Sequence, residues 1–129
     1  MTKTIRQTIY FSALPHKVYE SLIDKAKHAE FTGASAQIER KVGGKFSVWD
    51  GYAVGVNKEL VQDKLIIQTW CASDWPKEAE SIVKFELSKE NDKTKLIFTQ
   101  EGVPEEFCKD VATGWQDFYW RPLQRYLRE

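Results

Sequence analysis

Few residues in this sequence are able to hold a metal ion or form a covalent bridge. Its 129 residues include two cysteines and two histidines. Cys71 and Cys108 lie far apart, and His16 and His28 belong to no ligand-spaced motif, so we predict no metal site and no cofactor. We expect both histidines on helix surfaces and both cysteines in the reduced state, which is typical of a cytoplasmic protein.

An excess of one charge sign and long apolar runs are absent as well. Nineteen basic and nineteen acidic residues cancel, so no overall field attracts nucleic acid. No segment approaches the roughly 20 apolar residues that a membrane-spanning helix needs. The N-terminal MTKTIRQTIYF alternates instead of forming the apolar run of a signal peptide. We therefore predict neither a nucleic-acid partner nor membrane insertion.

Catalytic motifs are missing too. The sequence contains no G-x-S-x-G, no H-E-x-x-H and no glycine-rich phosphate loop. Its strand carboxylates are scattered, and carboxylates at such positions usually face water. We therefore predict no catalytic residue. The length fits one domain over residues 1–129.

The sequence does have clear apolar periodicity. Alternation with period two predicts a strand over residues 4–11, and helical spacing then predicts two short helices over 15–22 and 25–31. Alternation returns in further expected strands at residues 35–39, 45–50, 52–61, 65–72, 81–88 and 95–102. A last helix of roughly 24 residues, on the order of 36 Å long, follows Pro104. This order predicts an α+β fold in which a curved antiparallel sheet of six or seven strands surrounds a long C-terminal helix.

Large side chains form one stripe on the last helix, expected to face the sheet. At steps of three and four residues, the stripe contains Val111, Trp115, Phe118 and Pro122. Two interpretations stay open: these residues pack as core, or some of them line a ligand cavity. Pro122 removes a backbone hydrogen bond and predicts a kink, which lets the helix follow a curved sheet. Gly114, which lacks a side chain, lets a strand or a ligand come close.

The sheet is expected to supply the opposite wall. Alternation places these apolar side chains on one face: Phe46, Val48, Trp70, Phe85 and Phe98. Together with the helix stripe they are our predicted ligand-binding residues. An inward Gln68 or Gln100 either orients a ligand by hydrogen bonding or is a satisfied core amide.

Three further aromatic residues lie near turns and loops. Trp49 and Tyr52 either rim the mouth of a cavity or cover a sheet edge. Trp75 precedes Pro76 in a polar loop, and functional contacts are frequent on loops. We therefore predict Trp75 as an exposed contact for a partner, with a lid over the core edge as the alternative.

Three stretches give the chain a family resemblance: TWCASDWPKEAESIVKFEL, VPEEF and GWQDFYWRPLQRYL. They resemble the START-like (SRPBCC) superfamily and, within it, the family named for the activator of the heat-shock protein 90 ATPase. Members carry a W-x(n)-W-P segment and end with G-W-x(3)-Y/F-W/Y-x-x-L. The matching residues are Trp70, Trp75, Pro76, Gly114, Trp115, Tyr119, Trp120 and Leu123.

The resemblance implies a helix-grip fold with a cavity or groove between sheet and helix. In the superfamily that space holds lipids, hormones or polyketides, and some members are cyclases or hydrolases. In the eukaryotic chaperone activators, a domain of this kind follows an N-terminal domain that carries the main chaperone-binding surface. This chain has room for the later domain only.

Three functional hypotheses result. We place first a non-enzymatic domain that binds a small hydrophobic molecule between sheet and helix. A protein-interaction module that acts as cofactor of a heat-shock protein 90-type chaperone comes second. A cyclase-like or hydrolytic enzyme comes third, because it needs an acid, a base or a hydroxyl directed into the cavity.

Overall fold

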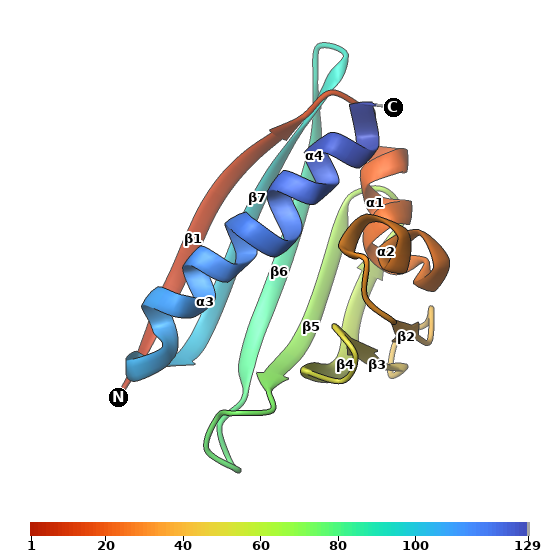
Figure 1. The fold of residues 1–129 in the computed structure, drawn as a ribbon. Coiled ribbons are helices and arrows are strands. Elements are labelled where there is room, and N and C mark those ends of the chain that lie inside the picture. The colour runs from red at the N-terminus through yellow and green to blue at the C-terminus, as the bar shows by residue number, and fades with distance from the viewer. Residues whose placement is uncertain (129) are drawn as a thin grey trace.

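A computed structural model describes residues 1–128, and its centre is one antiparallel sheet (Figure 1). The seven strands follow the order β1-β7-β6-β5-β4-β3-β2. Their bounds are β1 (Thr2–Phe11), β2 (Gln37–Ile38), β3 (Lys45–Val48), β4 (Ala53–Val61), β5 (Leu65–Ala72), β6 (Ser81–Glu90) and β7 (Lys93–Pro104). From β2 to β7 each strand pairs with the next one along the chain, and β1 then pairs with β7.

All helices lie on one face of this sheet (Figure 1). Their bounds are α1 (Pro15–Ile23), α2 (Lys25–Thr32), α3 (Cys108–Trp115) and α4 (Arg121–Arg128), with a 3-10 turn at Glu105–Phe107 and a π turn at Gln116–Trp120. The segments from α3 to α4 run as one helix diagonally across the sheet. The predicted α+β helix-grip class is confirmed. No helix within residues 1–128 is long and apolar enough to cross a bilayer.

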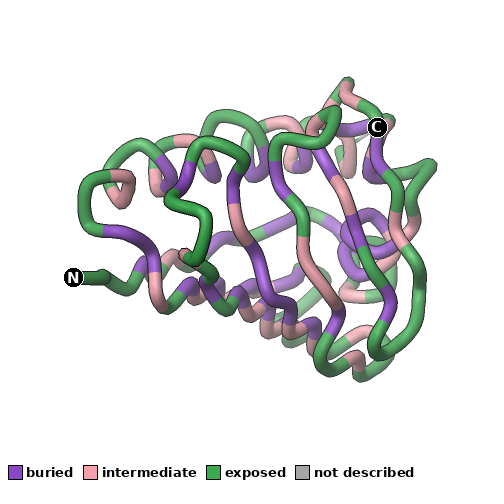
Figure 2. The backbone as a smooth tube through the Cα atoms, turned by 90° about the horizontal axis from the view of Figure 1, so that it is seen from below, coloured by how far each residue is buried: buried purple, intermediate pink, exposed green. Residues whose placement is uncertain are grey.

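Alternating side chains explain why the sheet has one buried face. Along β6, Val83, Phe85 and Leu87 are buried, and the residues between them are exposed or half-buried. Figure 2 shows buried positions alternating with exposed or half-buried ones on neighbouring strands as well. The predicted inward set of Phe46, Val48, Trp70, Phe85 and Phe98 is buried in full. Alternation groups these side chains on one face but leaves open which face is inward, and the structure shows that this face is the buried one.

The π turn changes which residues of the C-terminal helix face the sheet. The backbone N–H of Arg121 donates to the carbonyl of Gln116, five residues earlier. The turn therefore contains one residue more than an α-helical turn. Pro122 follows at once and has no N–H for the carbonyl of Phe118. After Trp115, the buried positions on the helix are therefore Tyr119, Trp120 and Leu123.

The prediction that Phe118 and Pro122 continue the buried stripe is consequently wrong. Phe118 is 55% exposed, and Pro122 is only half-buried. The predicted stripe extended a period of 3.6 residues through a turn that has a longer period.

His28 also differs from its predicted position on a helix surface. It is 3% exposed, and its ring lies 5.0 Å from that of Phe31 and 5.4 Å from that of Tyr119. The error arises because α2 packs against the C-terminal helix, which buries a face of α2 that carries little apolar character. The periodicity of α2 alone contained no sign of this packing.

Candidate functional site

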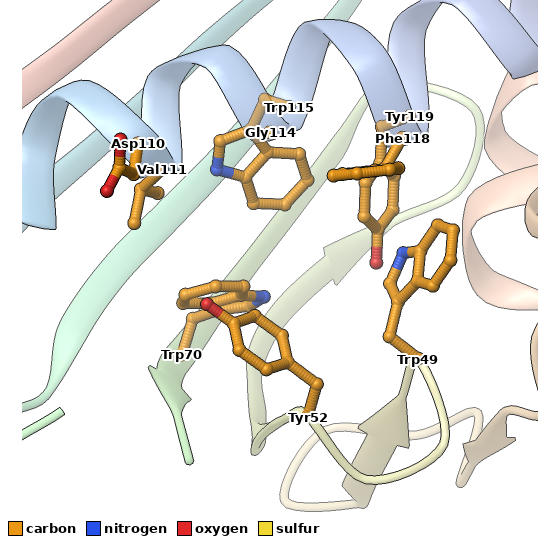
Figure 3. Close-up of a pocket in the computed structure, with 9 residues that line it drawn as sticks. All are labelled: Trp49, Tyr52, Trp70, Asp110, Val111, Gly114, Trp115, Phe118 and Tyr119. Atoms are coloured by element: carbon orange, nitrogen blue, oxygen red, sulfur yellow. The ribbon is translucent and has the colours of Figure 1, made fainter. Parts of the chain in front are cut away.

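A pocket lined by aromatic side chains opens between the C-terminal helix and the sheet (Figure 3). Its volume is about 290 Å³, near the lower end of the roughly 300–1,000 Å³ that is usual for ligand sites. The lining residues are Trp49, Tyr52, Trp70, Asp110, Val111, Gly114, Trp115, Phe118 and Tyr119. We call this space the aromatic pocket. Six of its nine lining residues are aromatic, so its walls offer flat apolar surfaces.

The turn between β3 and β4 supplies one side of the mouth. Trp49 and Asp50 adopt the left-handed backbone region, with φ of 54° and 55°, which costs non-glycine residues free energy. Two hydrogen bonds join this turn to Ser35: the Ser35 N–H donates to Asp50 Oδ1 at 2.8 Å, and the Asp50 N–H donates to the Ser35 carbonyl at 3.2 Å. These bonds hold the turn so that the Trp49 ring lies 5.3 Å from the Phe118 ring.

Gly114 supplies the space on the helix side. A Cβ atom placed there would meet only Phe118 Cδ2, at 3.8 Å, so a methyl group fits without strain. Glycine in a helix interior is less stable than alanine by about 1 kcal/mol. The missing side chain therefore lowers helix stability locally and leaves room for a ligand between Val111 and Phe118.

The back wall consists of two tryptophans whose positions are fixed by buried hydrogen bonds. Trp115 Nε1 donates to Gln100 Oε1 at 2.8 Å, and Gln100 Nε2 donates to Ser81 Oγ at 2.9 Å. Ser81 Oγ in turn donates to the carbonyl of Trp70 at 2.7 Å. The rings of Trp70 and Trp115 lie 5.6 Å apart. Because each member has a partner, this wall is rigid before any ligand arrives.

The ionisable groups of the pocket are one carboxyl and two phenols. Burial raises the pKa of Tyr52, and the carboxylates of Asp74 and Asp110 add to the increase. Burial also raises the pKa of Tyr119, and a hydrogen bond with Trp49 opposes this increase. Figure 3 shows the indole nitrogen of Trp49 directed toward the Tyr119 hydroxyl. Both phenols are therefore neutral at physiological pH, and the pocket favours apolar binding over acid–base chemistry.

The structure brings some predicted ligand-binding residues together and separates others. The aromatic pocket is lined by four of them: Trp70, Val111, Trp115 and Phe118. A second, smaller cavity beside it is lined also by Phe46, Val48 and Phe85. Phe98 lines neither; its ring packs 4.4 Å from that of Trp115 in the core. Pro122 lies farther along the helix and is also outside both lining sets. Exposed Phe118 still lines the pocket because it lies at the mouth.

Trp75 does not have the predicted exposed position. It is 6% exposed, and its ring lies 5.3 Å from that of Trp70 and 6.4 Å from that of Phe107. The loop folds back over the end of the sheet, so the alternative of a lid over the core edge is the one observed. The contact with Phe107 joins residues distant in sequence, which loop composition does not reveal.

Sequence reasoning missed two residues of the aromatic pocket. Asp110 precedes the buried Val111 and looked like an ordinary surface residue of a helix. Tyr119 was named as part of the family motif and not as a ligand-binding residue, and it enters the pocket because of the π turn. Pro122, which leaves a carbonyl unbonded one turn earlier, was the signal that the helical period changes near this point.

One cluster of possible metal ligands lies outside the pocket, at His16, Glu20 and Asp63. His16 Nδ1 lies 2.9 Å from Asp63 Oδ1. Arg40 already pairs with both carboxylate oxygens of Glu20. This arginine lowers the pKa of Glu20 and neutralises its charge, so the cluster is better described as an ion-pair network.

Comparison with known proteins assigns the chain to a family. The family model described as "Activator of Hsp90 ATPase homolog 1-like protein" matches residues 12–128. The chain belongs to this family. Among solved structures, it is similar to an HSP90 activator from Plasmodium falciparum, with a TM-score of 0.89 and 23% identity over 96% of this chain and 95% of that one. It is also similar to the Aha1 dimer from Colwellia psychrerythraea, with a TM-score of 0.80 and 20% identity over 97% and 96% of the two chains. These likenesses show the shared fold.

Curated relatives are longer than this chain. An activator of 90 kDa heat shock protein ATPase homolog from Dictyostelium discoideum is 32% identical over 89% of this chain and 30% of its own length. The human activator homolog 1 is 27% identical over 95% of this chain and 36% of its own length. The chain thus spans about a third of the length of these relatives.

Proposed function

We propose that this chain is a binding domain that holds a small, flat apolar molecule in the aromatic pocket. The observation that carries the proposal is a space of about 290 Å³ whose walls are mostly aromatic rings. The ring of Trp115 is held by its buried hydrogen bond to Gln100. It needs no reordering when a ligand enters, and this keeps the entropic cost of binding low. The two free thiols, Cys71 and Cys108, agree with a cytoplasmic location for this activity.

The expected affinity follows from the size of the pocket. A bicyclic aromatic ligand that removes roughly 200 Å² of apolar surface from water gains about 5 kcal/mol. Part of this gain is offset by the loss of rotational and translational freedom. We therefore expect dissociation constants in roughly the micromolar to millimolar range for simple aromatic probes.

A titration of isotope-labelled protein with 2-methylnaphthalene tests the proposal by NMR. We expect saturable shifts of the indole N–H signals of Trp49 and Trp70. Gly114→Phe places a ring in the pocket and should abolish these shifts. Thr113→Phe adds the same ring at the neighbouring exposed position of α3 and should leave them intact. Wild-type protein without saturable shifts, or Gly114→Phe with wild-type affinity, would contradict the proposal.

Family membership supports a second candidate function, that of a cofactor for a heat-shock protein 90-type chaperone. The curated relatives named as ATPase activators share this domain over about a third of their length. Exposed aromatic side chains among the lining residues of the pocket offer a contact surface, namely Phe118 at 55% and Tyr52 at 41% exposure.

The chaperone hypothesis is tested by measuring ATP turnover of the cognate chaperone with this chain added. We expect faster turnover and a loss of the effect in Phe118→Ser, while Tyr10→Ser on β1, at a comparably exposed ring away from the pocket, keeps it. Unchanged turnover with the wild-type chain would exclude this function. A cyclase-like reaction ranks third, since the one carboxyl group among the pocket's lining residues is Asp110.

A further inference from the structure

A second cavity of about 20 Å³ lies beside the aromatic pocket, and its polar lining sets it apart. Trp70, Trp115 and Tyr119 line both spaces. His28 and Gln68 line only the smaller one, which we call the polar chamber. Because Trp70 and Trp115 are held by buried hydrogen bonds, a ligand that enters both spaces requires the third shared side chain, the ring of Tyr119, to turn.

His28 enters the chamber with a polar atom that lacks a partner. The residue is 3% exposed, and no group within residues 1–128 bonds its buried Nδ1. Burial lowers the pKa of His28 to about 4. The imidazole is therefore neutral at physiological pH and offers one donor nitrogen and one acceptor nitrogen. A buried polar atom without a partner is rare in folded proteins and calls for an occupant that satisfies it.

Gln68 brings a second polar group to the same chamber. Its Nε2 donates to Asn57 Oδ1 at 2.9 Å. Asn57 is held in turn, since its Nδ2 donates to the carbonyl of Glu39 at 2.9 Å. This arrangement fixes the amide of Gln68 and leaves its Oε1 as an acceptor, to which no side-chain hydrogen bond is made within residues 1–128. Gln100, by contrast, is bonded at both ends.

The size and neutrality of the chamber select the group that fits. A water molecule needs roughly 10–15 Å³ of such space, so about 20 Å³ holds one oxygen atom with its hydrogen. A hydroxyl both donates and accepts, so it can donate to Gln68 Oε1 and accept from Nδ1–H of the neutral His28 tautomer that carries its proton there. A carboxylate is larger and would carry an unpaired charge into the interior, which is strongly unfavourable.

We propose that the polar chamber receives a ligand hydroxyl, so that the ligand of the aromatic pocket is a flat apolar alcohol or phenol whose polar end bonds His28 and Gln68. The inference rests on the proposed function, because the apolar body of the same molecule lies in the aromatic pocket. A ligand of this class gives the orphan imidazole atom a partner and adds a hydrogen bond at the amide oxygen of Gln68.

Two probes of nearly equal shape test the inference: 2-naphthol and 2-methylnaphthalene, which differ by a hydroxyl in place of a methyl group. We expect wild-type protein to bind 2-naphthol at least about 10-fold more tightly, the effect of one or two buried hydrogen bonds. NMR should also show contacts between the naphthol ring and the imidazole of His28. Equal affinities without such contacts would overturn the inference while leaving the proposed function intact. If neither probe binds, the proposed function itself fails.

Variants locate the preference within the chamber. Gln68→Leu and His28→Phe keep similar volumes and should each reduce the preference for 2-naphthol to less than about 3-fold, with 2-methylnaphthalene binding unchanged. Gln124→Leu removes a glutamine from α4, where its Nε2 bonds the carbonyl of Tyr10, and should keep the full preference. A preference that survives in both chamber variants would overturn the inference. If a variant fails to fold, the wild-type affinity ratio and the His28 contacts decide alone.

Discussion

Two ends of the same helix–sheet interface differ in how completely they are packed. At the β1–β7–β6 side, Trp120 Nε1 bonds Gln7 Oε1 at 2.6 Å, and the Gln7 amide bonds the carbonyl of Ala112 at 3.0 Å. At the β3–β4–β5 side, a pocket of about 290 Å³ remains, and His28 Nδ1 has no partner within residues 1–128. We call these the closed side and the open side. A single helix-grip fold thus combines a satisfied core with an open pocket.

The difference shows that packing quality varies within one domain according to local sequence. The closed side consists of long strands with alternating buried positions, and Phe98 packs against the rings of both Trp115 and Trp120. The open side has the short strand β3, the strained turn at Trp49 and Asp50, and Gly114 in the helix. With these features, fewer side-chain atoms fill the interior on the open side.

The largest expected contrast is between two aromatic truncations in the C-terminal helix. Trp115→Ala should lower the free energy of unfolding by about 4 kcal/mol, because it leaves a cavity beside Phe98 and an unpartnered Gln100. Phe118→Ala should cost under about 1 kcal/mol, because the ring is already 55% exposed. Urea denaturation of both variants measures the two values. Equal losses would show that Phe118 belongs to the core after all.

Acidification should lower the free energy of unfolding through the protonation of His28, which lies on the open side. Its pKa is 6.5 in an unfolded chain and about 4 in the folded one, so the unfolded state binds a proton between these values and the folded state does not. Stability is therefore complete above pH 6.5 and falls as the pH drops toward 4, by about 3 kcal/mol in total.

His28→Phe should remove this contribution, because phenylalanine does not titrate. The free energy of unfolding of both proteins, measured by urea denaturation from pH 7.5 to 4, gives the difference between the two slopes. Gln124→Leu on α4 removes no titrating group; it is the control and should keep the wild-type slope. A His28→Phe slope equal to that of wild type would mean that His28 is solvated in the folded protein.

Two buried amides should respond unequally to the same substitution: Gln100, which bonds Trp115, and Gln68, which lines the polar chamber. Gln100→Leu leaves Trp115 Nε1 without its acceptor and should lower the free energy of unfolding by about 2–3 kcal/mol. Gln68→Leu loses one bond, to Asn57, and should cost about 1 kcal/mol. Thermal unfolding of the pair sharpens the comparison, and a greater loss for Gln68→Leu would reverse it.

The smallest expected effect is a gain in stability. Gly114→Ala should raise the free energy of unfolding by about 0.5–1 kcal/mol, because alanine favours the helix and its methyl group fits beside Phe118. The same methyl group should weaken binding of 2-methylnaphthalene slightly. A loss of stability would indicate that the backbone at Gly114 needs the conformational freedom of glycine.

The sheet was predictable from sequence because its faces depend on a local rule. Alternation grouped Phe46, Val48 and Phe85 on one face, which the structure shows to be the buried one, and the polar turn between β6 and β7 set the register of that hairpin. Side-chain direction in a strand changes with every residue, so a few alternating positions are enough to define it.

The candidate site was only partly predictable because it depends on a change of helical period and on distant contacts. The predicted ligand-binding set contained Trp70 and Trp115, and both residues line the pocket. Within the π turn, Tyr119 is the buried ring and Phe118 is exposed. Trp75 and His28 became buried through elements far along the chain, and one sequence by itself does not contain those contacts.

The measurement that tests the central claim most directly is a crystal structure of the protein soaked with 2-bromonaphthalene, with the bromine located by anomalous scattering. The account predicts a bromine peak inside the aromatic pocket, between the rings of Trp70 and Phe118, with Trp115 in its present position. A pocket closed by its own side chains, or bromine found only at other surfaces of the protein, would contradict it.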